Sequence, residues 1–204
     1  MMITALILAD SRFPGGGHVH SGGLEEAAAR RLVTDEKSLE SFLYGRLHTA
    51  GLLAAGFAAA RGDLDELDAE LDARTPSPAQ RAASRAQGRG MLRAARRAWP
   101  SARLDELPRN PHHPIVVGVL VEDPYEAALT CAYLAVSGPA SAAVRLLGLD
   151  PFGVNAIVAR LAPDLRQVAE QATKELPAIG SPALDLLAEA HDRHHQEEVR
   201  LFGS

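Results

Sequence analysis

Residues 10–25 read Asp10-Ser-Arg-Phe-Pro-Gly-Gly-Gly-His-Val-His-Ser-Gly-Gly-Leu-Glu25, a stretch that holds five glycines and one proline. An apolar run, Ile3 to Ala9, precedes the stretch, and an alanine-rich helical pattern follows it. Glycine permits positive φ angles and close backbone approach, at a high entropic cost when it is ordered. Because apolar residues are interleaved with the glycines, the composition is not that of a flexible linker. The stretch predicts a tight turn packed between helices, with a helix start near Ser21 or Gly22 and Glu25 in the first turn.

The same stretch resembles the amino-terminal signature of the UreF-type urease accessory proteins, which is roughly Leu-Pro-x-Gly-Gly-Phe-Ser-x-Ser-x-Gly-Leu-Glu. The residues that fit this signature are Phe13, Pro14, Gly15 or Gly16, Gly17, Ser21, Gly23, Leu24 and Glu25. Three neighbouring positions depart from it: His18 stands where an aromatic residue is usual, Val19 where a serine is usual, and His20 lies in the same strip.

Motifs in the second half of the chain extend the resemblance. They are His113-Pro-Ile-Val-Val-Gly118, Ser141-Ala-Ala-Val-Arg-Leu146, Leu161-Ala-Pro163, Ser181-Pro-Ala-Leu-Asp-Leu186 with His191, and Arg200-Leu-Phe202. Each is similar to a family segment, and they occur in the family's order. Two features depart from the family pattern. Gly148-Leu-Asp-Pro151 stands where Pro-Leu-Gly-Gln is usual, and extra residues separate His191 from Arg200.

Length and composition are those of an ordinary globular protein. A chain of 204 residues is typical of one domain, here 1–204 with a flexible tail at about 192–204. Aromatic residues make up only 4% while alanine and leucine abound, which favours helix over sheet. The single Cys131 excludes an internal disulfide, and its apolar neighbours predict a buried thiol in a reducing compartment. No basic leader opens the chain, and no run approaches the roughly 18 apolar residues that span a bilayer. We therefore expect a soluble, cytoplasmic protein.

Helix-start signals recur along the chain. Thr34 followed by Asp35 and Glu36 predicts a capping hydroxyl with acids in the first turn. Side chains that can cap a helix precede prolines at Ser77, Asp123, Asp150 and Ser181. The expected helices lie at about 34–57, 78–97, 115–121, 124–136, 140–148, 152–174 with a kink at Pro163, and 182–198, with a break at Gly138-Pro139. The valine-rich run at 115–121 could be a strand, but no second strand candidate could pair with it. The fold class is all-α, a single-domain bundle of about nine or ten helices.

Charge is unevenly distributed. The net charge is −5, which argues against a general nucleic-acid binder. Residues 63–72 hold six acids and no base, whereas residues 75–104 hold seven arginines and no acid. Five of the arginines follow a strict four-residue spacing on one helix, namely Arg81, Arg85, Arg89, Arg93 and Arg97. This arginine stripe has three interpretations: a solvated face, a docking face for an acidic partner, or a face packed against the preceding acidic segment.

No catalytic constellation is present in the sequence. The chain lacks a phosphate-binding loop, a serine-hydrolase elbow, and the Cys-x-x-Cys or His-Glu-x-x-His patterns of zinc sites. His191 with His194 or His195 has the spacing of two imidazoles on one helix face, and His18 with His20 could share a metal only from an extended strip. Spacing alone is weak support, so no metal ligand is assigned. His112 and His113 precede a proline and are expected at the start of a helix.

Arg145 lies in an otherwise apolar helical segment. A buried guanidinium needs a carboxylate or carbonyl partner, because burying an unpaired charge is costly. The sequence therefore predicts a core ion pair, with Glu25 as a candidate partner, and the alternative is a contact at an interface.

The resemblance implies a function. It implies a non-catalytic accessory protein, often a homodimer, that helps to load nickel into apo-urease by bridging a urease-binding accessory protein (UreD or UreH) and the nickel-carrying GTPase UreG. It implies no tightly bound cofactor, with nickel handled by the complex, and no nucleic-acid or membrane partner. The residues expected to contact partners are Pro14, Gly15, Gly16, Gly23, Leu24, Glu25, Arg145, Arg200, Leu201 and Phe202. The alternative functions are a helical regulatory or nucleic-acid-binding module that uses the stripe Arg81–Arg97, and an enzyme with a histidine–metal site, which lacks a third ligand.

Overall fold

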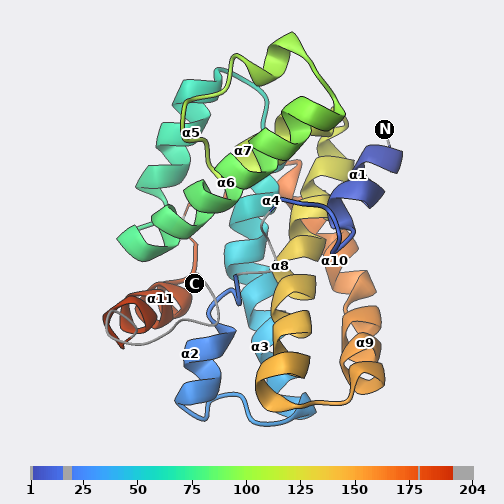
Figure 1. The fold of residues 1–204 in the computed structure, drawn as a ribbon, viewed down its shortest axis with the longest axis vertical. Helices are drawn as coiled ribbons and strands as arrows, with labels where there is room; N and C mark the ends of the chain where they lie inside the picture. The colour runs from blue at the N-terminus through green and yellow to red at the C-terminus, as the bar shows by residue number, and fades with distance from the viewer. Residues whose placement is uncertain (1, 16–19, 179, 195–204) are drawn as a thin grey trace.

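The structure is a computed structural model that describes residues 2–15, 20–178 and 180–194. Within these ranges every regular element is a helix, which confirms the all-α prediction (Figure 1). The elements are α1 (Met2–Ala9), α2 (Leu24–Ala29), α3 (Glu36–Arg46), the π-helix η2 (Leu47–Gly51), α4 (Leu52–Ala59), α5 (Leu64–Ala73), α6 (Pro78–Ala98), the 3-10 helix η3 (Ala102–Leu104), α7 (His113–Leu120), α8 (Pro124–Leu147), α9 (Pro151–Arg160), α10 (Ala162–Ala172) and α11 (Pro182–His194). Because α3, η2 and α4 are continuous, the described α-helices form ten rods, in agreement with the nine or ten expected.

Two helices occupy the centre of the bundle. Figure 1 shows α4 and α8 side by side, with α9 and α10 along one flank, α2 and α11 on the other, and α5 and α6 across one end. Small residues of α4 and α8, such as Ala55 and Ala132, are fully buried between them. One apolar cluster joins α8 to α3, α9 and α10, and a second joins α4 to α6 and α7. The core is therefore built on close helix contacts rather than on aromatic residues.

The predicted capping devices are present at the proline-containing helix starts. Asp123 accepts a hydrogen bond from the amide of Glu126 at 2.8 Å. Asp150 caps α9 in the same way, and the hydroxyls of Ser77 and Ser181 cap α6 and α11. One expected cap is wrong by a residue. Asp35 rather than Thr34 caps α3, because its carboxylate and the Ser38 hydroxyl bond reciprocally to each other's backbone amides.

The expected break at Gly138-Pro139 is wrong, because α8 runs through both residues to Leu147. A proline inside a helix removes the hydrogen bond to the carbonyl four residues earlier, here that of Ala135. In this structure the Nε of Arg46 donates to the Ala135 carbonyl at 2.8 Å. An arginine from another helix thus supplies the missing donor, and the helix continues.

Because α8 is continuous, its apolar stretch is longer than expected from the sequence. Among the described helices, α8 alone has the length and apolar composition of a membrane span, which the expected break had hidden. Most of its apolar window, 61%, is buried inside the protein, and α8 packs against α4 and α10. It is the central core helix of the bundle.

The segment 152–174 also differs from its prediction. It forms two helices, α9 and α10, separated at Leu161, rather than one kinked helix. Pro163 lies in the first turn of α10, where its missing N–H is not needed. The run at 115–121 lies largely in the helix α7, as predicted, and the acidic segment 63–72 forms α5. The last helix begins as expected and is described to His194, so its predicted end at 198 lies outside the described residues.

Candidate partner-binding site at the glycine-rich turn

The first half of the glycine-rich stretch is fixed to α6. The Phe13 ring stacks on Trp99, with ring centroids 5.8 Å apart. Gly15 is buried, and a Cβ atom there would meet the methyl group of Met91 at 3.3 Å. Pro14, between them, is exposed. Gly16, Gly17, His18 and Val19 lie outside the described residues.

The second half of the stretch forms the turn that begins α2, which we call the Gly22–Gly23 turn. Gly22 has φ +64° and Gly23 has φ +89°, a left-handed conformation that favours glycine. The buried Ser21 hydroxyl accepts from the amide of Glu25 at 3.3 Å. The helix begins at Leu24 with Gly23 at the N-cap position, just after the predicted start, and Glu25 lies in its first turn as predicted. The prediction of positive φ or close contact is confirmed for Gly23 and, by its contact with Met91, for Gly15.

Arg46, at the end of α3, connects this turn to α8. Its guanidinium donates to the carbonyl of Gly22 at 2.7 Å and, as described above, to that of Ala135. Burial lowers the pKa of Arg46 to about 10, so the side chain remains charged at neutral pH. Sequence reasoning missed this residue. The available signal was Pro139 in the middle of an apolar helical pattern, which implies a carbonyl in need of a donor.

The helix that follows the turn is largely buried. Leu24 is fully buried, Glu25 is buried, and the carboxylate of Glu26 is only 1% exposed. Glu26 accepts from Arg30 at 2.6 Å and lies 3.1 Å from Nδ1 of His194 in α11. Burial would raise the pKa of Glu26, but these hydrogen bonds outweigh it and hold the pKa below its usual value. The link between α2 and α11 therefore depends on a buried carboxylate that sequence reasoning did not single out.

Arg145 is exposed on α8, whereas Glu25 is buried. The expectation that Arg145 is a core residue is therefore wrong. Its position near the end of α8 places its side chain on the outer face of that helix, because the inner face is occupied by small residues such as Ala142 and Ala143. Arg200, Leu201 and Phe202 lie outside the described residues.

The candidate histidine ligands do not share one environment. His191 is buried while His194 is exposed and paired with Glu26, and His18 and His195 lie outside the described residues. His20 acts electrostatically on His113 at the start of α7. Burial, with a smaller contribution from the charge of His20, lowers the pKa of His113 to about 4. In the part of the chain that the structure describes, no group of three or more His, Cys, Asp or Glu side chains is arranged to hold a metal ion.

A cavity of about 170 Å³ adjoins the turn. Gly22, Gly23 and Arg46 line one part of it, and residues of η2, α4, α5, α6, α7, α8 and α11 contribute to the rest. Cys131 contributes to the wall and is buried, as its neighbours predicted. Burial raises the pKa of its thiol to about 12, so the thiol stays protonated and is a poor nucleophile.

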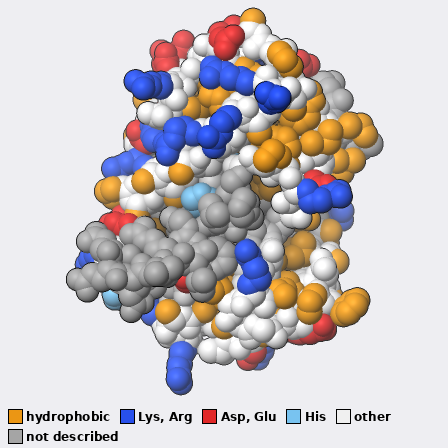
Figure 2. All heavy atoms as spheres, viewed as in Figure 1, with side chains coloured by type: hydrophobic (Ala, Val, Ile, Leu, Met, Phe, Trp, Pro, Cys, Tyr) orange, Lys and Arg blue, Asp and Glu red, His pale blue; other side chains and the backbone are white. Residues whose placement is uncertain are grey.

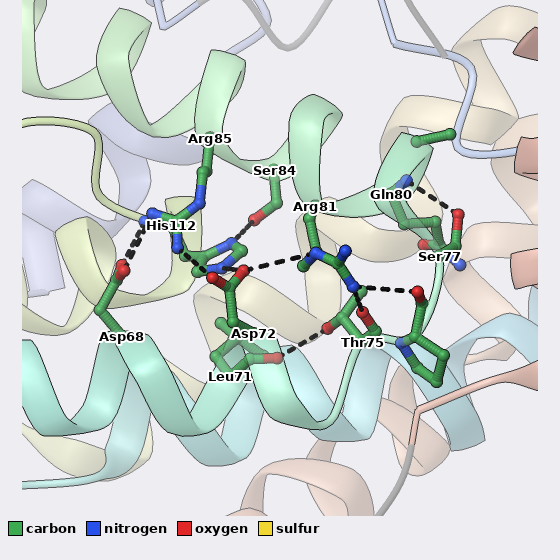
Figure 3. A network of polar contacts seen from close by, with 12 residues as sticks. Asp68, Leu71, Asp72, Thr75, Ser77, Gln80, Arg81, Ser84, Arg85 and His112 are labelled. Carbon is green, nitrogen blue, oxygen red and sulfur yellow. Dashed lines mark hydrogen bonds and ion pairs between the residues drawn. The ribbon is translucent and has the colours of Figure 1, made fainter.

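The arginine stripe divides into an internal and an external part. Arg85 donates to Asp68 at 2.9 Å and to Asp72 at 2.7 Å, and Arg81 donates to the carbonyl of Thr75 at 2.7 Å (Figure 3). This end of the stripe packs against the acidic α5, as the third interpretation predicted. The other end is exposed at Arg89, Arg93 and Arg97, and Figure 2 shows basic side chains gathered on that part of the surface. The internal pairing weakens the nucleic-acid interpretation, because the charges of Arg81 and Arg85 are already engaged within the molecule.

His112 completes the same network. Its ring lies 2.8 Å from Asp72 and 2.9 Å from the hydroxyl of Ser84, and its amide donates to Asp68 at 2.7 Å (Figure 3). Burial lowers the pKa of His112, although Asp72 opposes this effect. As predicted, His112 lies at the start of a helix: it occupies the N-cap position of α7 in an extended conformation, without a side-chain capping bond.

The grouping of Ser84, His112 and Asp72 resembles a catalytic triad only in composition. His112 is completely buried, so no substrate can reach the proton-transfer position. Ser84 lies inside the long helix α6, where the backbone amides are bonded within the helix and cannot form an oxyanion hole. The network is a structural link among α5, α6 and α7.

The described residues define a helical protein that offers shaped surfaces and a buttressed turn rather than a reaction centre. The comparisons with known proteins identify the family. The family model UreF matches residues 33–162. The urease accessory protein UreF of Mycolicibacterium vanbaalenii is 47% identical over 214 aligned residues, which cover 100% of this chain and 99% of that protein. Those of Mycobacterium bovis (BCG Pasteur) and Mycobacterium tuberculosis (H37Rv) are 49% and 48% identical over 195 residues, 92% of each chain. The chain belongs to the UreF family of urease accessory proteins, and it is an accessory protein rather than a catalyst.

Proposed function

We propose that this protein is a scaffold for nickel insertion into apo-urease. In this role it bridges a urease-binding accessory protein of the UreD or UreH type and a nickel-carrying GTPase of the UreG type, as a homodimer in the cytoplasm. The observation that supports the proposal is the 47% identity to a urease accessory protein over the whole chain, including the glycine-rich stretch. A scaffold role agrees with two further points. The family resemblance implies no catalytic residue, and the network around Ser84 has a structural role.

The partner surface that we propose centres on the glycine-rich stretch. The exposed Pro14 is its accessible point, and Gly15 and Gly16 follow it in the sequence. The buried Leu24 and Glu25 support the turn, and Gly23 sets its direction. Arg145, exposed on α8, and the tail residues Arg200, Leu201 and Phe202 are further proposed contacts. On this proposal, most of the signature shapes the surface and only part of it touches the partner.

We assign nickel to the complex and propose that this chain has no tightly bound cofactor. His194 is engaged with Glu26, and His191 is buried in a different environment, so the two imidazoles with the best spacing are not displayed together. The GTPase is the natural carrier, because the UreF-type chain lacks a phosphate-binding loop that could couple metal release to nucleotide hydrolysis.

A complementation experiment tests the proposed function. Cells that express the urease subunits and the other accessory proteins are prepared with and without this chain, and urease activity and bound nickel are measured. We expect both to be lost without the chain and restored by it, and we expect the tagged chain to capture the other two accessory proteins. Full activation of urease in its absence, at normal nickel supply, would refute the proposal.

A further inference from the structure

Three residues from distant parts of the chain meet at the glycine-rich turn. A Cβ atom on Gly22 would lie 2.8 Å from Cζ of Arg46 and 3.0 Å from Cγ of Pro139. The distance to the guanidinium is shorter than real Cβ contacts, and the distance to the proline ring is at the tight limit, so the turn lies close against both groups. The turn therefore rests directly on the two residues that shape the middle of α8.

Pro139 determines which backbone group of α8 is free to bond a neighbouring residue. The proline leaves the carbonyl of the half-buried Ala135 without a helical partner, and a carbonyl that is shielded from water without a donor is unfavourable. Arg46 supplies the donor from its Nε atom, 89 positions away in the sequence. The neighbouring nitrogen of the same planar group bonds the carbonyl of Gly22. One rigid fork thus joins the turn to α8, and a lysine, with a single nitrogen, could not match this geometry.

The backbone next to Arg46 is irregular at the point where its side chain extends towards Gly22 and Ala135. Arg46 is the last residue of α3, and the π-helix η2 follows it directly. A π-helical turn changes the angular positions of the residues after it and is frequent at functional sites. The carbonyls of Gly22 and Ala135 are neutral, so the half-buried Arg46 side chain has polar partners but no carboxylate hydrogen-bonded to it among the residues that the structure describes.

We propose that Arg46 is a positioning residue that holds the Gly22–Gly23 turn in the shape that a partner protein recognises. It does so by bonding the turn and the carbonyl that Pro139 leaves open in α8. This inference rests on the proposed scaffold function, and it adds a half-buried residue that supports the turn to the residues proposed to contact partners. It also explains the need for glycine at position 22, where any side chain would collide with the fork.

The two hydrogen bonds of Arg46 can be separated by substitution. Arg46→Gln removes both. Adding Pro139→Ala to that variant restores a helical N–H for the Ala135 carbonyl but leaves Gly22 without its donor. Arg160→Gln is the matched control, because Arg160 is an exposed arginine that bonds only Glu40 among the described residues. Thermal unfolding, hydrogen exchange of the amides at 20–28, and capture of the partner accessory proteins are measured for each variant.

We expect Arg46→Gln to lower the unfolding temperature and to speed hydrogen exchange at 20–28 by about tenfold or more, the size expected for the loss of a charge-assisted hydrogen bond. In the double variant the unfolding temperature should recover towards that of Pro139→Ala alone. Exchange at the turn should stay fast, and partner capture should stay at least about tenfold weaker. Arg160→Gln should match the wild type in all three measurements.

Two results would overturn the inference. The first is hydrogen exchange of the turn amides in Arg46→Gln that is as slow as in the wild type. The second is partner capture by the double variant that equals that of the wild type, which would show that Arg46 only stabilises the fold. Hydrogen exchange is independent of urease. Failure of the wild-type chain to support urease activation would count against the proposed function, whereas a normal turn without Arg46 would count against this inference.

Discussion

The guanidinium of Arg85 lies 2.7 Å from the carboxylate of Asp72, and this contact joins α6 to α5. Arg85 also bonds Asp68, whose side chain is only 9% exposed. Burial would raise the pKa of Asp72, but hydrogen bonds from Arg85 and His112 outweigh it and hold the pKa below its usual value. The contact shows that a regular stripe of charges on one helix can have two different roles along its length.

The first prediction compares two arginines of this stripe. Arg85→Ala removes the cation that pairs with the buried Asp68 and leaves Asp72 with only the longer ion pair to Arg81 at 3.8 Å, so it should destabilise the protein by about 3 kcal/mol. Arg89→Ala removes an exposed guanidinium on the same helix and should change stability by less than about 0.5 kcal/mol. Urea unfolding followed by circular dichroism measures both. Equal effects of the two substitutions would show that the network with α5 does not stabilise the fold.

The second prediction concerns three glycines. Gly22 and Gly148 share φ +64°, but a Cβ atom would collide with Arg46 at Gly22 and meet nothing within 4 Å at Gly148. Alanine at Gly148 should therefore cost about 1 kcal/mol for its conformation alone, and alanine at Gly22 distinctly more.

Gly45, inside α3 with open space around it, is the control, and Gly45→Ala should stabilise the protein by about 0.5–1 kcal/mol. Thermal unfolding ranks the three variants. A Gly22→Ala variant no less stable than Gly148→Ala would mean that the turn can move away from Arg46, contrary to the tight packing described above.

The third prediction is a dependence of stability on pH. The pKa of His113 is lowered from 6.5 to about 4, mainly by burial, so the unfolded chain binds this proton more readily than the folded one. Its contribution to stability is complete above about pH 6.5, declines as the pH falls towards 4, and changes no further below that. Denaturant unfolding between pH 7.5 and about 4 measures the slope.

His113→Gln should reduce that slope without abolishing it, because the lowered pKa of the buried His112 acts in the same direction. The two proteins are compared by the slope of stability against pH, and not by their absolute stabilities, because the substitution also alters packing. A slope identical to that of the wild type would show that His113 is not kept neutral by the fold.

The fourth prediction addresses the terminal histidines. A variant with His194→Ala and His195→Ala should still activate urease, because the spacing of these residues is weak support for a metal site and Glu26 keeps its bond from Arg30 when His194 is lost. His191 is left unchanged, since it is buried and its loss would disturb α11. The assay is urease activation at limiting nickel. Loss of activation by a variant that stays folded and captures its partners would show that these imidazoles deliver the metal.

The sequence alone determined the features that depend on near neighbours. The caps at Asp123, Asp150 and Ser181 involve atoms within three residues of one another, so their residue types are enough to predict them. The same holds for the left-handed turn at Gly23 and for the helical class. The glycine-rich stretch also indicated the family, because its residues and their order are themselves the signature.

Only the tertiary structure decided whether Pro139 ends a helix. By local rules a proline without an N–H breaks the helix, and the donor that prevents this comes from Arg46, far away in the chain. The same reason applies to His112, whose buried bonds reach Asp72 and Ser84, and to Arg145, whose exposure depends on what packs against α8. Local patterns state which polar groups need partners, whereas the packing of helices decides which distant groups satisfy them.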